Sequence, residues 1–193
     1  MGKIQFLIDQ KNPHLGGSIV DGDQNTWSPK LWDFVIDDLG IKSMIDVGCG
    51  EGFSTKYFIN KGIDAYGVEG LYSAYERSGI KDKIYYHDYT EGKIKIKQEF
   101  DLTWSCKFVE HVDEKYMHNF LDTFSKSKHI LMTHAFPNQG GYHHVNCQNP
   151  DYWIYQLQQY GYEYDYEYTV KLRELTEPIA IYAKQSLLYF KKK

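Results

Sequence analysis

Short apolar runs alternate with amphipathic segments in the first half of the chain. The apolar runs at residues 44–47, 65–68 and 83–87 have the length of buried strands. Between them, residues 54–61 and 71–77 place apolar side chains at helical spacing. Strands that alternate with helices in this way predict a parallel sheet, because each crossover returns the chain to the same edge. Ligands of such sheets bind beyond the carboxyl ends of the strands.

The second half of the chain continues this alternation. Tyrosines alternate with other residues from Tyr160 to Tyr168, which is typical of a half-buried strand. We expect a strand at 100–105 and then a helix that Asp113 caps, with apolar residues from Tyr116 to Phe124. A strand at 129–133 and a helix that begins at Asn149-Pro150 and ends at Gly161 follow. Two final strands are expected at 162–168 and 187–190.

The first 40 residues have a different pattern. Turn-forming pairs come first, and a helix is predicted over residues 29–39 with Ser28 as its N-cap. Neither a repeat nor a low-complexity linker divides the chain, and 193 residues is close to the size of one ordinary domain. We therefore expect one domain over 1–193, with a cap or lid segment and a helix in 1–40 and an α/β core in 41–193.

The most informative motif follows the first strand of this core. Glycines alternate in a G-x-G-x-G arrangement over Gly48–Gly52, and Glu69 ends the next strand. Glycines let the backbone approach a ligand, and a carboxylate after the second strand can accept hydrogen bonds from a ribose diol. Dinucleotide sites favour G-x-G-x-x-G instead. Here Asp46 and Glu51 would repel a pyrophosphate, whereas they would attract the ammonium and sulfonium groups of S-adenosylmethionine.

These residues, together with the pair Glu110-His111 after the fourth strand, carry a family resemblance. The chain resembles the class I S-adenosylmethionine-dependent methyltransferases, in particular their small-molecule branch, over roughly residues 43–190. The resemblance implies a Rossmann-like α/β fold, namely a seven-stranded, mostly parallel sheet with helices on both faces and an antiparallel last strand. It also implies that residues 14–27 form a lid over the cofactor.

The same resemblance implies which residues bind the cofactor. Glu69 would accept hydrogen bonds from both ribose hydroxyls. Asp88 would accept one from the adenine amino group, beside the aromatic ring of Tyr89. The alternative for Asp88 is that it only caps the following turn. The residues expected at S-adenosylmethionine are Asp46, Gly48, Cys49, Gly50, Glu69, Gly70, Asp88, Tyr89, Ser105 and Cys106.

Composition narrows the classes of partner and compartment. The chain has 22 basic and 26 acidic side chains and a net charge of −4, so it offers no general attraction to nucleic acid or to an anionic membrane surface. Its three cysteines form no C-x-x-C pair, and the N-terminus lacks the pattern of a secretion signal. No apolar run approaches the roughly 18 residues that span a bilayer. We therefore expect a soluble, cytoplasmic protein.

Histidines are concentrated where an acceptor would bind. His111 follows the fourth strand, and His143 and His144 lie in a loop after the fifth. An ordinary imidazole pKa of about 6.5 suits removal of a proton from a hydroxyl acceptor. The alternatives are that Glu110 and His111 only shape the backbone around the cofactor, and that the loop histidines are structural. Metal binding by the loop histidines is a further alternative; we expect no metal, because adjacent histidines of an extended backbone point to opposite sides and a third and fourth ligand are not evident.

Together these observations predict transfer of a methyl group to a small-molecule or saccharide acceptor, through oxygen. Enzymes that methylate exocyclic amino groups of nucleobases commonly carry Asn/Asp-Pro-Pro-Tyr/Phe after the fourth strand. This chain has Trp-Ser-Cys-Lys at 104–107, which disfavours such acceptors. Two alternatives stay open: a non-catalytic module that binds S-adenosylmethionine and, less favoured, an NAD-type oxidoreductase. The glycine spacing and the Glu110-His111 pair argue against the oxidoreductase.

Overall fold

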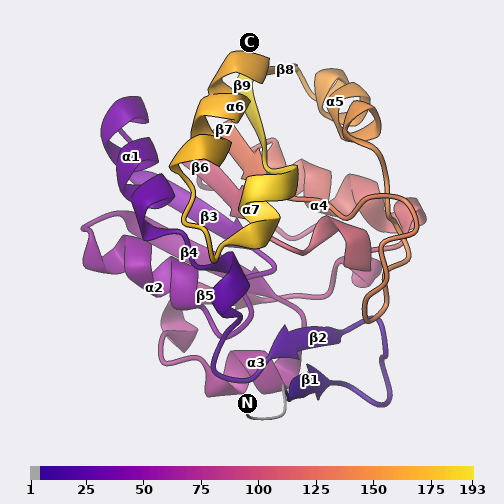
Figure 1. Cartoon of the computed structure of the whole chain (residues 1–193). Helices are drawn as coiled ribbons and strands as arrows, with labels where there is room; N and C mark the ends of the chain where they lie inside the picture. The colour runs from indigo at the N-terminus through magenta and orange to yellow at the C-terminus, as the bar shows by residue number, and fades with distance from the viewer. Residues whose placement is uncertain (1–4) are drawn as a thin grey trace.

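The computed structural model describes residues 5–193, and its centre is a seven-stranded sheet (Figure 1). Five neighbouring strands run parallel, and the last strand of the chain, β9, lies antiparallel to both of its neighbours. The fold class predicted from the sequence is therefore confirmed. In spatial order the strands are β5 (Ile84–Tyr86), β4 (Asp64–Glu69), β3 (Ser43–Val47), β6 (Phe100–Ser105), β7 (Ser127–Met132), β9 (Leu188–Lys192) and β8 (Tyr162–Tyr164).

Helices cover both faces of this sheet (Figure 1). They are α1 (Pro29–Leu39), α2 (Phe53–Asn60), α3 (Tyr72–Arg77), α4 (Met117–Phe124), α5 (Pro150–Gln159), α6 (Tyr166–Leu175) and α7 (Ile181–Ser186). Successive side chains of a strand point to opposite faces, so β3 contributes to two cores. Met44 packs in one core with Trp32 of α1 and Phe58 of α2. Ile45 packs in the other with Phe120 of α4.

The predicted elements agree with the structure except at Asp113, which caps a 3-10 turn (Glu114–Tyr116) that precedes α4, and at the tyrosine-rich segment. The strand expected over residues 162–168 ends at Tyr164, and α6 begins at Tyr166. The reason is local, because the Asp165 carboxylate accepts a hydrogen bond from the backbone N–H of Tyr168 at 2.8 Å and so caps a helix. At α1, Ser28 occupies the N-cap position as predicted, but its side chain makes no capping bond.

The N-terminal residues form a separate two-stranded hairpin, β1 (Phe6–Ile8) with β2 (Gly16–Ile19). The hairpin contacts α3, and Figure 1 shows it at the lower side of the molecule, below the central strands. Short 3-10 turns complete the chain: η1 (Gln24–Thr26), η2 (Lys81–Lys83), η3 (Tyr89–Glu91), η4 (Val109–His111) and η5 (Glu114–Tyr116). Four of these turns, η1, η3, η4 and η5, supply residues that line the candidate site described below.

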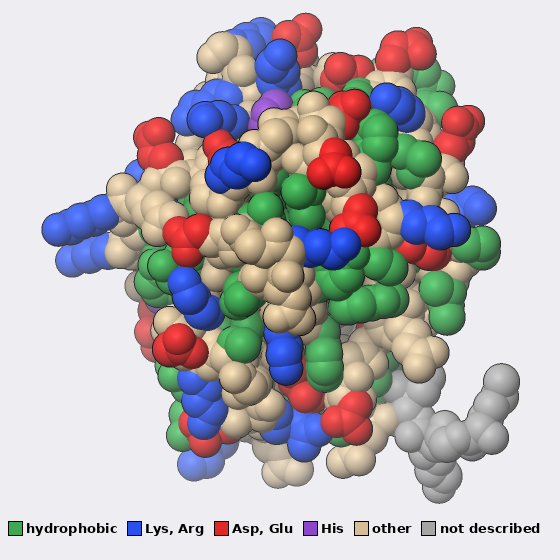
Figure 2. Space-filling view, turned by 90° about the vertical axis from the view of Figure 1, so that its left-hand side faces the viewer, with side chains coloured by type: hydrophobic (Ala, Val, Ile, Leu, Met, Phe, Trp, Pro, Cys, Tyr) green, Lys and Arg blue, Asp and Glu red, His purple; other side chains and the backbone are tan. Residues whose placement is uncertain are grey.

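The surface is mixed in charge on the face that Figure 2 presents. Acidic and basic side chains are interspersed there among apolar ones, in keeping with the small net charge of the chain. Within residues 5–193, no helix is long and apolar enough to cross a membrane.

Candidate active site

Two adjoining hollows lie at the carboxyl ends of the central strands. The first has a volume of about 550 Å³ and is lined by the glycine loop after β3 and by residues 17–27. The second, of about 320 Å³, is lined by Glu69 at the end of β4 and by the segment after β5. Four residues line both hollows: Ser18, Gly48, Lys107 and His111. The two hollows therefore form one candidate site at the edge of the sheet where the sequence predicted it.

Gly48 is the point at which the glycine loop meets the segment after β6. Its φ is +78°, a conformation that side chains disfavour. The backbone N–H groups of Gly48 and Cys49 both donate to the carbonyl of Val68, at 3.0 and 3.1 Å, so the loop is tied to β4. A Cβ at Gly48 would lie 2.5 Å from the ring of Phe108. Only glycine fits here, because it lets Phe108 close against the loop.

Glu69 is held by backbone donors between the two hollows. Its side chain is 9% exposed and accepts hydrogen bonds from the N–H groups of Gly50 and Leu71, both at 2.7 Å. Burial raises the pKa of Glu69, and these two bonds offset part of the rise. Its neighbour Gly70 also lines the second hollow and packs against Leu15. The structure thus brings Glu69 and the glycine loop together, as predicted.

Asp46 is a second buried carboxylate, at the end of β3. It accepts hydrogen bonds from the hydroxyls of Ser54 and Thr55, at 2.5 and 2.8 Å. Burial raises its pKa from 3.8 to about 6, although the two hydroxyl bonds lower it in part. Asp46 and Cys49 both line the first hollow. The first hollow therefore has a negative group at its inner wall above pH 6.

Asp88 lies at the second hollow and has two partners. One carboxylate oxygen accepts from the N–H of Thr90 at 2.8 Å and so caps η3, while the role of Asp88 at the adenine stays a prediction. The other lies 2.7 Å from Nε2 of His14. Burial raises the pKa of Asp88, but the His14 and Thr90 bonds outweigh it and leave the pKa below its ordinary value. The adjacent Tyr89 also lines this hollow, and its buried hydroxyl donates to Thr123 at 2.9 Å.

The two predicted residues at the end of β6 differ in position. Ser105 is buried, and its hydroxyl donates to the carbonyl of Val47 at 2.9 Å. It lines neither hollow, so its side chain holds two strands together. Cys106 lines the first hollow, and burial raises the pKa of its thiol to about 12. At neutral pH this thiol is protonated.

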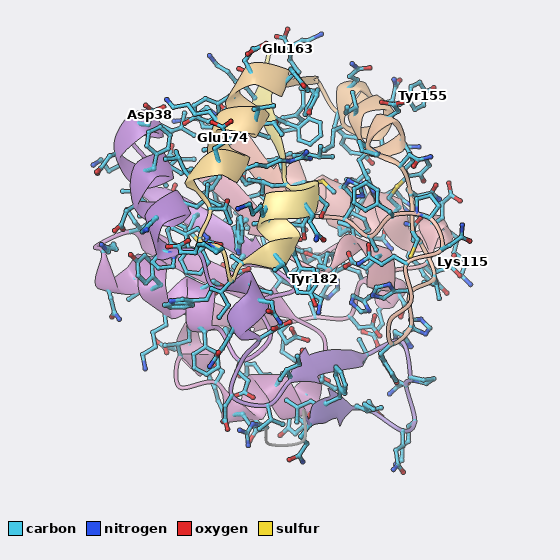
Figure 3. All side chains as sticks on the ribbon, in the orientation of Figure 1. Asp38, Lys115, Tyr155, Glu163, Glu174 and Tyr182 are labelled. Carbon is cyan, nitrogen blue, oxygen red and sulfur yellow. The ribbon has the colours of Figure 1, made fainter. Side chains whose placement is uncertain are left out.

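Lys107 is a site residue that the sequence analysis did not single out. It lines both hollows, and its φ is +56°. Its ammonium lies 3.2 Å from the carboxylate of Asp23 and 4.3 Å from the ring centre of Tyr182, which extends from α7 (Figure 3). A charged residue directly after the fourth strand was the available signal, since strand ends of this sheet carry ligand-binding groups.

The segment predicted as a lid lies against both hollows. Asp23 reaches across the first hollow to Lys107, and His14 reaches Asp88 at the second. Trp27 packs edge-on against Trp32 of α1, with ring centres 5.0 Å apart. These contacts fasten the N-terminal segment over the strand ends. Its role as a lid stays a prediction.

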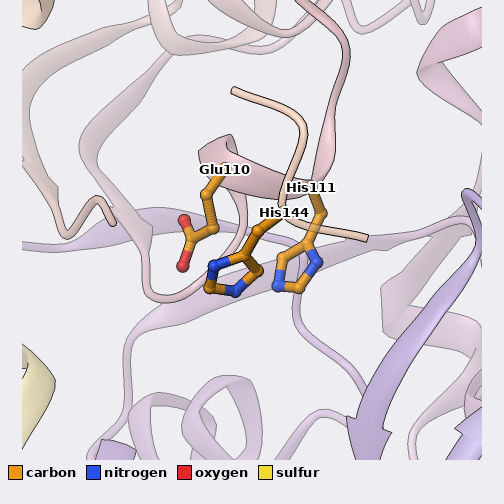
Figure 4. A group of neighbouring side chains, drawn as sticks. All are labelled: Glu110, His111 and His144. Atoms are coloured by element: carbon orange, nitrogen blue, oxygen red, sulfur yellow. The ribbon is translucent and has the colours of Figure 1, made fainter. Parts of the chain in front are cut away.

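The histidines predicted from the sequence do not all come together. His111 and His144 lie edge to face with ring centres 5.0 Å apart, and Glu110 lies beside them (Figure 4). His143 has a φ of +48° and lines the second hollow instead. The ring Nδ1 of His144 lies 3.0 Å from the carbonyl of Gln139, to which it donates a hydrogen bond. One cluster therefore joins η4 to the loop after β7.

Burial dominates the ionisation of this cluster. Glu110 is 2% exposed, and burial raises its pKa to about 7. Burial and then the nearby His144 lower the pKa of His111 to about 3, so its imidazole is neutral at physiological pH. Glu110 Oε2 and His111 Nδ1 are buried and have no hydrogen-bond partner among the described residues.

Comparison with known proteins agrees with this fold. No protein-family model matches the chain. A probable chloroplastic tocopherol O-methyltransferase of Oryza sativa subsp. japonica is 37% identical over 84 residues, which are 38% of this chain and only 23% of the rice protein. A TehB-like S-adenosylmethionine-dependent methyltransferase from Corynebacterium glutamicum has a TM-score of 0.62 at 16% identity, over 86% of this chain and 88% of that one.

Two further solved structures show the same likeness. An S-adenosylmethionine-dependent methyltransferase from Archaeoglobus fulgidus has a TM-score of 0.60 at 18% identity, over 89% of this chain and 96% of that one. The magnesium protoporphyrin IX methyltransferase of Synechocystis, solved with bound S-adenosylmethionine, has a TM-score of 0.60 at 12% identity, over 86% of this chain and 76% of that one. The chain has the fold of the class I S-adenosylmethionine-dependent methyltransferases, and the fold that the sequence resemblance implied is confirmed.

Proposed function

We propose that the protein is an S-adenosylmethionine-dependent methyltransferase that transfers a methyl group to oxygen of a small-molecule acceptor, saccharides included. The observation that carries this proposal is the joined pair of hollows, each of which is lined by at least one buried or half-buried carboxylate. Asp46 lies in the first hollow, and Glu69 and Asp88 lie in the second. Bound S-adenosylmethionine would supply an electrophilic methyl group on a sulfonium.

The carboxylates fit this cofactor better than a dinucleotide. Each oxygen of Glu69 accepts one backbone N–H and retains a lone pair for a ribose hydroxyl. Asp88 lines the second hollow and would accept from the adenine amino group, and Asp46 gives the first hollow a negative charge that suits an ammonium and a sulfonium. Negative groups at all three points would repel a pyrophosphate. This argues against the oxidoreductase alternative.

The first hollow leaves room for an acceptor beside the cofactor. His111 lines both hollows, and His143 lines the second. His111 is neutral at physiological pH, but its pKa of about 3 makes its imidazole a weak acceptor of a proton. The name of the rice relative, an O-methyltransferase, supports oxygen as the acceptor atom.

A matched pair of glutamate variants tests the cofactor site. Glu69→Ala removes two charge-assisted hydrogen bonds to the ribose, so we expect S-adenosylmethionine to bind about 100-fold more weakly, or about 3 kcal/mol. Glu76→Ala, an exposed position on α3, should bind as the wild type does. Calorimetric titration measures both, and circular dichroism checks that each variant is folded. Equal affinities in the two variants would remove Glu69 from the cofactor site.

Catalysis is tested separately, by formation of S-adenosylhomocysteine. The wild type is incubated with S-adenosylmethionine and panels of phenols, sugars and amines. We expect turnover with a hydroxyl-bearing compound. Turnover with amines alone would contradict the choice of oxygen. Tight binding of S-adenosylmethionine without turnover on any acceptor class would favour the non-catalytic module.

A further inference from the structure

We propose that Glu110, His111 and His144 bind a divalent transition-metal ion. Each of these residues offers one ligand atom, and the three atoms all lie within 4.8 Å of one another (Figure 4). Two imidazole nitrogens and one carboxylate oxygen are a ligand set that suits Zn²⁺, Fe²⁺, Co²⁺ or Mn²⁺. Mg²⁺ and Ca²⁺ prefer oxygen ligands, so the histidines disfavour them.

The buried polar atoms of this cluster call for a partner. Glu110 Oε2 and His111 Nδ1 have no hydrogen-bond partner among residues 5–193, although Glu110 is only 2% exposed. Buried carboxylates in proteins are normally paired, hydrogen-bonded or bound to a metal. Lys107 is a nearby cation, but its ammonium pairs with Asp23 at 3.2 Å. A metal ion held by the three residues would give the Glu110 carboxylate the partner that it lacks.

His144 makes the kind of hydrogen bond that metal-binding histidines commonly make. Its Nδ1–H donates to the carbonyl of Gln139, so the neutral ring carries its free lone pair on Nε2. Metal-binding histidines commonly donate their other ring N–H to a carbonyl or a carboxylate, which fixes the tautomer and the direction of the ring. The same carbonyl lies 3.6 Å from the thiol of Cys147, within the same loop.

Local backbone structure explains why neighbours in sequence can share one ion. Glu110 and His111 lie in the 3-10 turn η4, so their side chains need not point to opposite sides as they would in a strand. The carbonyl of Glu110 accepts from the N–H groups of Val145 and Asn146, at 3.0 and 3.1 Å. These bonds hold the loop that carries His144 against η4. The expectation of no metal considered His143 with His144, and the structure instead pairs His144 with His111.

Three protein ligands leave coordination positions open for a further ligand. His111 lines both hollows, so the ion would lie at the wall that the acceptor touches. There it would bind an oxygen of the acceptor and lower the pKa of that hydroxyl. This role rests on the proposed function, whereas metal binding itself does not.

Metal titration of the tag-free full chain, stripped with EDTA and dialysed, tests the site. Co²⁺ is followed by its visible absorbance and Zn²⁺ by calorimetry. We expect one ion per chain in the wild type, and binding weakened at least roughly 10-fold in His144→Ala and in Glu110→Gln. His143→Ala is the matched control, since His143 adjoins His144 but lies outside the cluster, and it should bind as the wild type does.

Either of two results would overturn the metal site: no stoichiometric binding by the wild type, or equal binding by wild type and His144→Ala. Each variant is also titrated with S-adenosylhomocysteine, which reports an intact fold and an intact cofactor site. A wild type that binds S-adenosylhomocysteine but no metal would refute the metal site and leave the proposed function standing. A wild type that binds metal but no S-adenosylhomocysteine would contradict the proposed function and leave the metal site standing.

Discussion

Asp46→Asn should change how the stability of the protein depends on pH. Asp46 is 2% exposed, and burial raises its pKa from 3.8 to about 6. A raised pKa means that the folded state holds this proton more tightly than the unfolded state does. The contribution of Asp46 to stability is therefore greatest below pH 3.8 and is lost as the pH rises through about 6. At about 1.4 kcal/mol for each pH unit, this rise in pKa corresponds to a loss of roughly 3 kcal/mol.

Urea denaturation of the wild type and of Asp46→Asn at intervals from pH 4 to pH 8 measures this effect. An asparagine oxygen still accepts from the hydroxyls of Ser54 and Thr55, but it carries no charge. The free energy of unfolding of the wild type should fall relative to the variant by about 2.5 kcal/mol between pH 4 and pH 8, because part of the full effect lies below pH 4, and the difference should level off above pH 7. The slope, rather than the absolute stability, is the test. Parallel profiles for the two proteins would refute the assignment of a buried, penalised charge to Asp46.

Two further predictions concern the backbone. Gly48→Ala should destabilise the protein by about 2–4 kcal/mol, because the new methyl group clashes with Phe108 in addition to the strain of a left-handed backbone. Gly40→Ala is the control: Gly40 has a φ of +64° and open space around it, so the change should cost about 1 kcal/mol. Equal costs of the two changes in urea denaturation would count against the Phe108 contact. Asp165→Ala should cost about 1 kcal/mol and lower Tm by about 3 °C, because the N–H of Tyr168 loses its cap. An unchanged Tm would show that α6 needs no cap.

Local patterns in the sequence account for most of the fold. The apolar runs, the glycine loop and Glu69 predicted the parallel half of the sheet, because a strand, a turn and a helix each leave a local pattern. The tyrosine-rich segment shows the limit of such patterns. Its alternation continues past Tyr164, but Asp165 starts a helix there, and a single capping hydrogen bond outweighs the strand-like pattern.

The sequence predicted those site residues that lie at the ends of strands, but not the contacts between segments that are far apart in the chain. Asp46 and Glu69 lie at the carboxyl ends of β3 and β4, and Asp88 follows β5, so sheet topology brings them together. Lys107 and Asp23 are 84 residues apart in the sequence, and no local pattern predicts their pairing. The meeting of His144 with His111 depends likewise on an irregular loop. Contacts of this kind are set by tertiary packing, which hydrophobic periodicity does not describe.

Calorimetric titration of the purified protein with S-adenosylhomocysteine and S-adenosylmethionine, with NADH as the control, tests the central claim most directly. The two hollows and their carboxylates predict one micromolar site per chain for the adenosyl compounds and no measurable binding of NADH. The absence of binding by both adenosyl compounds would contradict the proposed cofactor. Equal or tighter binding of NADH would contradict the electrostatic argument from Asp46, Glu69 and Asp88.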